Sequence, residues 1–591
     1  MRLMNRLGLS GKVMGCVVCV LAVGAVLACS STTKAQPASD TPSQTKQADA
    51  RITLVQANVP VLVNRQYNLV AKLTIQGPGE LRGLTARCGG GLRGLFLAPA
   101  DDEGRVNVED PRGLITLRER QSGDQRLLRQ LEPDASGNVV ERTFACEPAR
   151  LDDGEHVYWL LAHVSEQADL DSRLVIEPTR VRLGRDRDGV AVEDADLVEG
   201  GLRLGYRLRH RGDDGSQGYR IPGLVRTNDG TLLGCYDIRR PSNRDLQGDM
   251  DIGISRSTDG GRTWEPMRVG LDMGQWGGLP EKYNGVSDAG LLVDRNTGRV
   301  FVFGCWMHGL RTKEGQFRTD LTEDNDAWSH QWHGGMVGSG PGMTPRETCQ
   351  MIMAYSDDDG QTWSDPINIT QQIKDPSWYL VAPAPGSGIT LADGTLVMPA
   401  QGRDEQQRTF STLMVSHDHG ETWAYAPSPA RLDTTECTVV QLADGSLMLN
   451  MRDNRNRRNK SETNGRAVAV THDLGETWEV HSSDHRSDLL PESTCMAHLL
   501  RVDRPDGHSV LVFSNPNNRH QRTNQTIKVS FDEGVTWPAE HWVELDAHRG
   551  AGYSCKAAAD DGAIVILYES SQGYLVIQRV SADDLGLDAG E

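Results

Sequence analysis

One eight-residue motif, S-x-D-x-G-x-T-W, occurs five times in this chain of 591 residues. The copies begin at Ser257, Ser356, Ser416, Thr471 (where Thr replaces Ser) and Ser530. Self-similarity of this kind is typical of repeat architectures. Asp and Gly favour a tight turn, and the Thr and Trp after them favour a strand. We therefore expect each copy to be a structural hairpin turn whose Trp packs in its own sheet, with His417 and His419 of the third copy as surface turn residues.

A second repeated pattern indicates the number of sheets. A turn that ends in Gly precedes an apolar run six times, beginning at Asp229, Thr297, Asp393, Asp444, Asp506 and Asp561. Each occurrence predicts a hairpin that leads into a buried strand, and the first five are each followed by one copy of the motif. Six units of about four short strands predict an all-β fold. We expect a six-bladed β-propeller over residues 195–591, with its sixth blade completed by a strand from near residues 195–212.

The N-terminus has the pattern of an export signal. Three basic residues precede the apolar stretch 13–28, which is too short for a good transmembrane span. The stretch ends in V-L-A-C, which resembles a bacterial lipobox with Cys29 as the lipid-carrying residue. We therefore predict a signal peptide at residues 1–29 and a protein of the periplasm or cell surface that touches the membrane only through its lipid anchor. An ordinary cleaved signal is the alternative.

Two segments separate the signal from the repeats. Residues 30–50 are rich in Ser, Thr, Gln and Pro without apolar periodicity, which predicts a flexible tether. Residues 51–190 contain alternating apolar stretches and few helical patterns, which predicts a separate β-sandwich-like domain. Such a domain could bind or position carbohydrate, or only pack against the repeats, and both remain open. Its Cys88 and Cys146 are the first pair to test for a disulfide, with buried free thiols as an equal alternative.

Charge and composition limit the partners. The net charge of −19 argues against nucleic acid and anionic membrane surfaces. No cofactor is predicted, and no metal site either: His308, His330 and His333 lack carboxylate or Cys partners at ligand spacing. The long polar segment 309–349 is expected to cover the mouth of the propeller channel.

Polar side chains recur at one level of successive repeats. Nine or ten residues before the hairpin Gly of four repeats stand Arg220, Asp288, Glu436 and Tyr553. Seven or nine residues after the hairpin Gly of the first, third and fourth repeats stand Arg239, Arg403 and Arg452. Both offsets return to the same end of a hairpin, so we expect these side chains to converge near the propeller axis.

These positions resemble those of the exo-α-sialidases (neuraminidases), especially the secreted bacterial ones. The resemblance rests on G-Y-R-I-P at 218–222, R-x-x-x-x-x-D at 239–245, and the segments 436–452, 522–530 and 552–554. It covers about 400 residues, to the end of the chain. Because the five turn motifs also occur in unrelated propellers, the ordered set of polar residues carries more weight.

The resemblance implies a carboxylate-binding triad of Arg220, Arg452 and Arg522. Three guanidinium groups can hold the carboxylate of sialic acid through charge-assisted, fork-shaped hydrogen bonds that Lys would not reproduce. Arg519 lies only three residues from Arg522 and is the alternative for the third position.

The resemblance also implies the catalytic residues. A carboxylate nucleophile would be repelled by the substrate carboxylate, and sialidases differ from most glycosidases in using a Tyr instead. Tyr553 is therefore the expected nucleophile and Glu436 its base. Asp245 is the expected general acid and then general base, a role that favours a raised pKa through desolvation or neighbouring carboxylates. The implied reaction is a retaining hydrolysis through a Tyr-linked covalent intermediate.

Four further residues are predicted to touch the sugar. Asp288 and Arg239 are assigned to its hydroxyl or amide edge, and Gln401 and Arg403 to its glycerol tail. The predicted partners are sialylated glycans, glycoproteins or gangliosides, and the chain is expected to be a monomer. A trans-sialidase and a sialic-acid-binding propeller without turnover remain alternatives. The presence of all three expected catalytic residues argues against the second.

Overall fold

The computed structural model describes residues 50–120, 138–184, 188–246, 248–307, 339–504 and 506–587. Residues 48–591 form one compact unit, distinct from residues 1–47. The predicted signal peptide with Cys29, the tether up to residue 49, and the three His of the metal hypothesis lie outside the described residues, as does most of segment 309–349. Within the described ranges, no helix is both long and apolar enough to cross a membrane.

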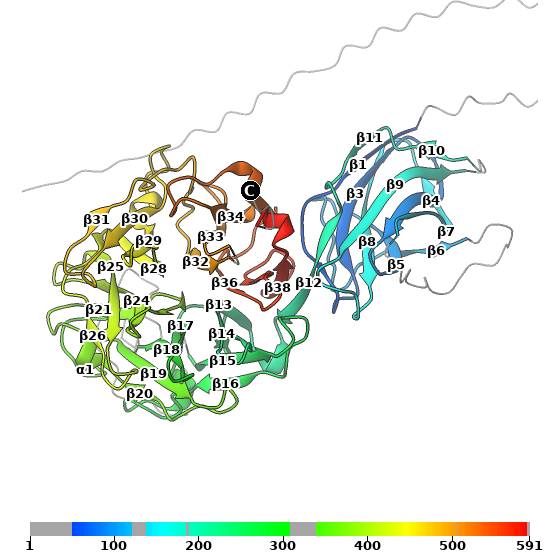
Figure 1. Cartoon of the computed structure of the whole chain (residues 1–591). Coiled ribbons are helices and arrows are strands. Elements are labelled where there is room, and N and C mark those ends of the chain that lie inside the picture. The colour runs from blue at the N-terminus through cyan, green and yellow to red at the C-terminus, as the bar shows by residue number, and fades with distance from the viewer. Residues whose placement is uncertain are drawn as a thin grey trace, which may run out of the picture. The chain divides into compact units, whose positions relative to one another are not determined.

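The repeats form sheets arranged in a ring, as predicted for a β-propeller (Figure 1). Blade 1 comprises β13 (Gly218–Arg226), β14 (Leu232–Arg239), β15 (Met250–Ser257) and β16 (Arg268–Leu271). Blade 2 comprises β17 (Val286–Val293), β18 (Val300–Trp306), β19 (Gln350–Ser356) and β20 (Ile367–Asn368), with β22 (Gly386–Ser387) beside β17. Blade 3 comprises β21 (Leu380–Pro383), β23 (Ile389–Thr390), β24 (Leu396–Arg403), β25 (Thr409–Ser416), β26 (Ala424–Tyr425) and β27 (Arg431–Leu432).

The remaining blades follow the same antiparallel order. Blade 4 comprises β28 (Thr434–Gln441), β29 (Leu447–Asp453), β30 (Ala467–Thr471) and β31 (Glu479–Val480). Blade 5 comprises β32 (His498–Asp503), β33 (Ser509–Pro516), β34 (Gln525–Ser530) and β35 (Trp542–Asp546). Helical elements are short: α1 (Thr370–Ile373), η1 (Asp213–Gly215), η2 (Glu281–Tyr283), η3 (Asn454–Arg457), η4 (Ala539–His541) and η5 (Asp583–Leu585).

The sixth blade joins the two ends of the propeller. It comprises β36 (Ser554–Ala558), β37 (Ile564–Tyr568), β38 (Leu575–Val580) and, as its outer strand, β12 (Leu202–Arg209). Strand β12 pairs antiparallel with β38, for example Tyr206 with Ile577. The outer strand thus comes from before blade 1, as predicted, so the ring is closed by hydrogen bonds between distant parts of the chain.

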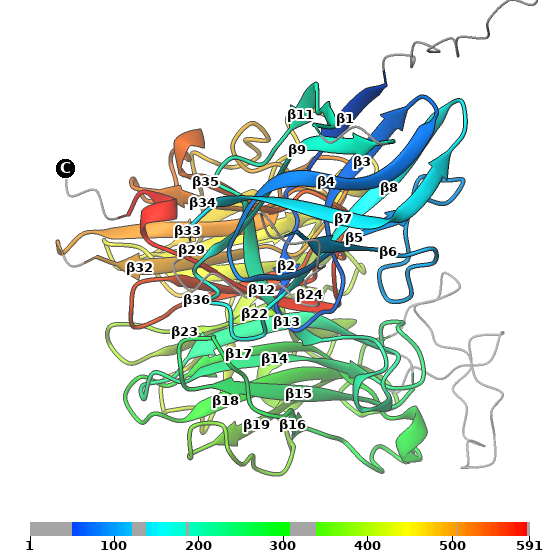
Figure 2. The ribbon, with the colours of Figure 1, turned by 90° about the vertical axis from the view of Figure 1, so that its right-hand side faces the viewer.

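The N-terminal domain is a two-layered β-sandwich (Figure 2). One layer contains β11 (Asp194–Asp196), β1 (Arg51–Val55), β3 (Asn68–Gln76), β8 (Glu155–Val164), β5 (Leu92–Pro99) and β6 (Ile115–Glu119). The other contains β7 (Val140–Leu151), β4 (Gly79–Gly89), β9 (Arg173–Leu183) and β10 (Val190–Ala191). Leu73 and Leu160 of the first layer share one core with Leu84 and Ile176 of the second, because alternate residues of each strand face inward.

The Cys88–Cys146 disulfide hypothesis is wrong in this structure, where both residues are free. Cys88 is in β4 and Cys146 is in β7, and these two strands pair antiparallel. Cys88 lies opposite Val140, whereas Cys146 lies beside the Gly83–Ala145 pair. A separation of about six residues along a strand is roughly 20 Å, whereas a disulfide requires Cα atoms about 5.5 Å apart. The alternative of free thiols holds.

The repeated motif is a structural turn, as predicted. In the third copy Asp418 accepts hydrogen bonds from the Thr422 N–H (2.9 Å), the Thr422 hydroxyl (2.6 Å) and the Ser416 hydroxyl (2.8 Å). The other four copies repeat this arrangement. Each Asp therefore holds its own turn together through a side chain that accepts at least three hydrogen bonds.

The position of the motif Trp differs from the prediction. Trp423 of blade 3 packs edge-on against Phe301 and Phe303 of blade 2, at ring distances of 6.0 and 5.2 Å. Each of the five Trp side chains belongs to a different apolar cluster, shared by its own blade and the preceding one. The motif turn folds back toward that neighbour: a Cβ atom at Gly420 would lie 2.2 Å from the Phe301 ring. The motif Trp side chains thus join neighbouring blades to one another and do not pack only within their own sheet.

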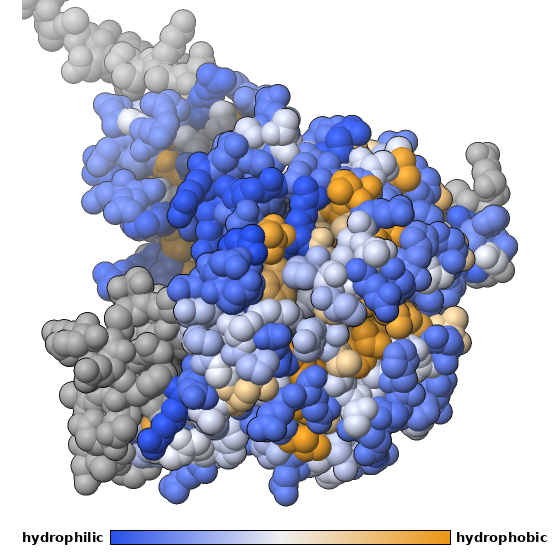
Figure 3. Space-filling view, turned by 90° about the vertical axis from the view of Figure 1, so that its left-hand side faces the viewer, coloured by the Kyte–Doolittle hydropathy of each residue, from blue (hydrophilic) through white to orange (hydrophobic). Residues whose placement is uncertain are grey.

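Most apolar side chains are consequently enclosed between blades. On the face shown in Figure 3, hydrophobic residues form small separate groups within a hydrophilic surface. Exposed large apolar side chains, such as Val480 and Val535, are scattered along the chain.

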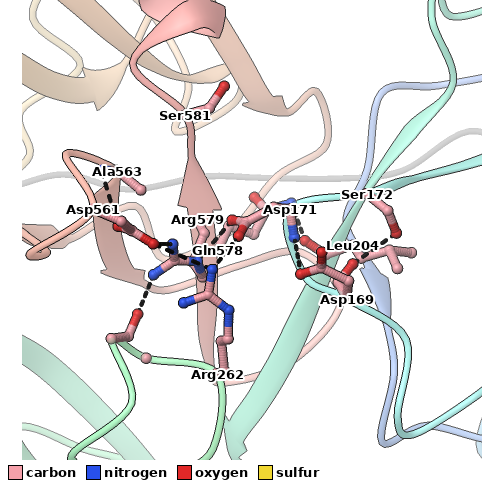
Figure 4. Close-up of polar contacts among 12 residues, drawn as sticks. Asp169, Asp171, Ser172, Leu204, Arg262, Asp561, Ala563, Gln578, Arg579 and Ser581 are labelled. Atoms are coloured by element: carbon pink, nitrogen blue, oxygen red, sulfur yellow. Dashed lines mark hydrogen bonds and ion pairs between the residues drawn. The ribbon is translucent and has the colours of Figure 1, made fainter.

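Strand pairing and an ionic network join the two domains. β2 (Val61–Leu62) and β9 both pair with β12, so the N-terminal domain continues the sheet of blade 6. In Figure 4, Asp171 accepts hydrogen bonds from Arg579 (2.7 Å) and Arg262 (2.5 Å), and Asp561 binds the same two Arg side chains at 2.6 and 3.2 Å. The Arg579 side chain is almost completely buried, so this balanced set of two cations and two anions compensates its charge.

Candidate active site

A cavity of about 390 Å³ lies where the first strands of the blades converge. Nine of the ten predicted catalytic and substrate-binding residues line it: Arg220, Asp245, Asp288, Gln401, Arg403, Glu436, Arg452, Arg522 and Tyr553. They come from all blades of the ring or the loops beside them, so the shared register in the sequence does correspond to a shared place in space. Arg519, the alternative to Arg522, does not line this cavity.

Tyr553, Glu436 and Arg452 form a buried hydrogen-bonded group. The Tyr553 hydroxyl donates to Glu436 Oε1, and Arg452 Nη1 donates to Glu436 Oε2. Arg452 Nη1 also lies 3.0 Å from the Tyr553 hydroxyl oxygen. A carboxylate in direct contact with a phenol is the arrangement that lets the carboxylate take the phenol's proton.

The surroundings move the pKa values of Tyr553 and Glu436 apart. Burial raises the pKa of Tyr553 well above its ordinary value of 10, and the Glu436 carboxylate raises it further. Burial of Glu436 opposes ionisation too, but the Arg452 guanidinium and the Tyr553 hydroxyl outweigh burial and lower the pKa of Glu436 below 4.5. At neutral pH the pair is therefore a neutral phenol beside an ionised carboxylate.

Two more guanidinium groups flank the phenol. The Cζ atoms of Arg220 and Arg522 each lie 5.5 Å from the centre of the Tyr553 ring. Arg522 is oriented by the backbone, since it donates to Ala551 O (2.7 Å) and Thr494 O (2.8 Å). With Arg452 they surround one side of the cavity with positive charge, a suitable site for a planar carboxylate.

Glu569 orients Arg220 and was not predicted. Its carboxylate binds Arg220 Nε at 2.5 Å and Nη2 at 3.2 Å, and accepts the backbone N–H groups of Ile221 and Tyr553 at 3.0 Å each. A signal for it exists in the sequence: Glu569 stands seven residues after its hairpin Gly, as Arg452 does.

Comparisons with known proteins identify the family of the chain. A family model described as a BNR repeat-like domain matches residues 242–566. A sialidase of Bacteroides fragilis is 44% identical over 435 residues, which cover 73% of this chain and 74% of that protein. This chain belongs to the bacterial sialidases with BNR repeats. It is accordingly a glycoside hydrolase.

Two further sialidases resemble this chain. A sialidase of Micromonospora viridifaciens is 33% identical over 400 residues, which cover 65% of this chain and 55% of that protein. Among solved structures, the Hadza microbial sialidase Hz136 is 35% identical with a TM-score of 0.75. That match covers 90% of this chain and 100% of the other, so the likeness includes most of the N-terminal domain as well as the propeller.

Arg239 differs from its predicted role as a sugar contact. The side chain is fully buried and does not line the cavity. Its guanidinium binds Asp237 (2.9 Å) on one side and Asp245 Oδ1 (2.7 Å) on the other. Arg239 therefore lies behind Asp245 and positions it, because an Arg with no exposed surface must be neutralised by carboxylates around it.

Asp245 itself lies at the cavity in a more open setting than predicted. Its side chain is 63% exposed, so it is not desolvated, although Asp237 and Asp288 supply nearby carboxylates. The Arg239 ion pair fixes one carboxylate oxygen and leaves the side chain in contact with the cavity.

Asp288 occupies a strained position at the cavity wall, within β17, where the pairing with β18 shifts register. Its φ of +61° lies in the left-handed region, which Asp tolerates better than most residues. Its N–H donates to Asp237 Oδ1 at 3.1 Å. Burial, then the neighbouring Asp237 and Glu436 carboxylates, raise the pKa of Asp288 well above 3.8. These surroundings favour the protonated form of Asp288, which can donate a hydrogen bond to a ligand.

The remaining wall is mixed in character. Gln401 donates to Pro383 O at 3.2 Å, which fixes its amide at the cavity, and Arg403 lies two residues further along β24. Leu246, Leu380 and Ala382 form an apolar patch beside them. Among the described residues, no cluster of three or more His, Cys, Asp and Glu side chains could hold a metal ion.

Proposed function

We propose that this sialidase is an exo-α-sialidase, which releases terminal sialic acid from sialylated glycans through a covalent Tyr553 intermediate with retention of configuration. The hydrogen bond from the buried Tyr553 hydroxyl to Glu436, inside a cavity with three Arg side chains, is the observation that carries the proposal.

The three Arg side chains select an acidic sugar. Arg220, Arg452 and Arg522 present guanidinium groups from three separate blades toward one cavity. A sugar whose anomeric carbon bears a carboxylate would be held with that carbon above the Tyr553 hydroxyl. Fixing the reacting atoms in this way removes most of the entropic cost of bringing them together.

In the first step the Tyr553 oxygen attacks the anomeric carbon. Because the phenol has a raised pKa, it does not ionise beforehand, and Glu436 must take the proton as the new C–O bond forms. Asp245 gives its proton to the departing glycosidic oxygen. The products of this step are a free alcohol and a sugar bonded to Tyr553.

The second step reverses the roles. Asp245, now a carboxylate, takes a proton from water, and the water oxygen attacks the anomeric carbon from the side that the leaving group vacated. The bond to Tyr553 breaks, and Glu436 returns the proton to the phenol oxygen. Two inversions at one carbon give net retention.

A fluorogenic α-sialoside tests the proposal. The wild type should release the fluorophore, and Tyr553→Phe should lower kcat by about 10³-fold or more while the fold persists. Tyr355→Phe, remote from the cavity, is the matched control and should behave as wild type. No release by the wild type between acid and neutral pH, or near-normal activity of Tyr553→Phe, would overturn the proposal.

We also propose that the protein is exported and anchored through a lipid on Cys29, as the lipobox-like V-L-A-C suggests. Mass spectrometry of the mature N-terminus should find a diacylglyceryl group on Cys29. An unmodified N-terminus after cleavage elsewhere would contradict this.

A further inference from the structure

We infer that a second cavity beside the candidate active site binds the sugar to which sialic acid is attached, and that the N-terminal domain supplies part of its wall. The inference rests on the proposed function and adds a recognition site for the rest of the glycan. It commits to a neutral hexose, a ligand rich in hydroxyl groups.

The second cavity adjoins the first. It has a volume of about 410 Å³, and Arg220 lines both cavities, while its partner Glu569 lines the second. The Arg220 side chain thus separates the sialic-acid site from the second cavity and contacts both. A glycan held by its terminal carboxylate at Arg220 has its next residue within reach of this neighbouring space.

The second cavity lies on the side of the general acid. Asn243, two residues before Asp245 in the same loop, lines it. Asn243 is also coupled to the acid, because Arg239 Nη1 donates both to the Asn243 carbonyl (3.1 Å) and to Asp245. Since a general acid protonates the glycosidic oxygen, the leaving sugar must lie on the side of the loop that carries it.

The N-terminal domain contributes Arg65 and Glu109. Arg65 lies between β2 and β3, is almost fully buried, and donates to Gln572 O of the propeller at 2.9 Å. The other terminal nitrogen of its guanidinium, Nη2, donates at 2.7 Å to Oε1 of Glu109, which lies in the loop between β5 and β6. Arg65 thereby links the two domains and holds Glu109 over the cavity.

Glu109 is arranged to accept further hydrogen bonds. Arg207 Nη1 (3.6 Å) and His210 Nε2 (3.7 Å) approach the same oxygen, Oε1, that Arg65 binds. No described residue donates a hydrogen bond to Oε2, and the Glu109 side chain is 47% exposed. A carboxylate oxygen held in place with free lone pairs is a suitable acceptor for sugar hydroxyl groups.

The remaining wall fits a neutral sugar. Tyr574 and His210 line the cavity and pack edge to face at 6.2 Å, so they offer an aromatic surface against which a sugar ring can lie. The Asn243 amide can both donate and accept. The Arg65 charge is neutralised by Glu109, and Arg549 at the same wall can donate hydrogen bonds to sugar hydroxyl groups.

The test compares two substrates in the full-length protein. The ratio of kcat/KM for 3′-sialyllactose to kcat/KM for an aryl α-sialoside measures how much the lactose part contributes. Glu109→Ala and Asn243→Ala should each lower that ratio about tenfold, mainly through KM for the trisaccharide, as expected for loss of a hydrogen bond to a charged or fixed group. Glu155→Ala, an exposed Glu of the same domain outside the cavity, is the matched control and should keep the wild-type ratio.

The outcomes separate this inference from the proposed function. A wild-type ratio in both cavity variants, with both substrates hydrolysed, would overturn the second site and leave the sialidase proposal standing. Failure of the wild type on both substrates would overturn the proposed function and the inference together. Because Asn243 belongs to the propeller and Glu109 to the N-terminal domain, misfolding of one variant leaves the other decisive.

Discussion

Glu569 binds Arg220 through both carboxylate oxygens, at 2.5 Å to Nε and 3.2 Å to Nη2. The same two oxygens accept the N–H groups of Ile221 and Tyr553. One buried carboxylate therefore orients a substrate-binding guanidinium and fixes the backbone of the proposed nucleophile. Ile221 has a φ of +63°, which is rare for a β-branched residue, and its N–H bond to Glu569 helps to maintain that strained conformation.

Substitution Glu569→Gln should weaken substrate binding and stability together. It leaves Arg220 without a buried counter-charge, a change that typically costs about 3–5 kcal/mol. We expect KM for a sialoside to rise about tenfold and the unfolding temperature to fall, measured by steady-state kinetics and calorimetry. Asp503→Asn, which removes an exposed partner of Arg501, should change neither. An unaltered KM would show that Glu569 does not position Arg220.

Substitution Asp288→Asn should stabilise the protein at neutral pH. The pKa of Asp288 is raised on folding, so its contribution to stability is present below the unfolded value near 3.8 and is lost as pH rises through the folded value. Asn cannot ionise and tolerates the left-handed φ. The unfolding temperature of the variant should therefore exceed that of wild type at pH 7–8, and the difference should vanish below about pH 4. A difference that is the same at every pH would contradict this assignment.

Substitution Asp418→Ala should destabilise the propeller without changing the chemistry. Three hydrogen bonds to the turn are lost, and we expect a cost of about 1–2 kcal/mol. Because these bonds lower the pKa of Asp418, the stabilisation is present above its ordinary value of 3.8 and disappears as pH falls through the folded value. Thermal unfolding at pH 7 and at pH 3 measures both effects. Glu421→Ala, in the same turn but 75% exposed, is the control, and equal losses in the two variants would refute the role of Asp418.

Substitution Asp171→Asn should loosen the contact between the two domains. Arg262 and Arg579 lose a shared partner and keep Asp561 alone. Hydrogen exchange along β9 and β12 should become faster, while exchange in blade 3 stays unchanged. Glu166→Gln, an exposed neighbour in the same domain, is the comparison. Unchanged exchange in β9 and β12 of the Asp171 variant would show that strand pairing alone holds the domains.

The active-site residues could be predicted because propeller geometry is repetitive. The distance along the chain from a hairpin Gly determines the height of a residue within its blade, and that rule is local. It placed Arg220, Glu436, Arg452 and Tyr553 at one cavity without any knowledge of long-range contacts. The closing strand β12 was predictable for a related reason, since a ring of sheets is stable only when its last blade is complete.

Three features were not predictable from local patterns. Trp423 packs against the preceding blade, Arg239 lies behind Asp245, and Glu569 pairs with Arg220. Each depends on which side chain of one element meets which side chain of another, and residues at the same height can face the cavity or lie behind it. Offsets from a hairpin Gly do not distinguish these cases.

The sequence by itself determined the number of repeats, the turns that begin them and the chemistry available at the axis, because turn preferences and strand alternation act over a few residues. Only the tertiary structure decided which of those groups meet. Arg220 and Glu569 are 349 residues apart, and their contact exists only because β12 closes the ring and brings blade 6 beside blade 1. The wall formed by Arg65 and Glu109 has the same origin, since nothing in a local pattern shows that a domain outside the repeats will pack beside the cavity.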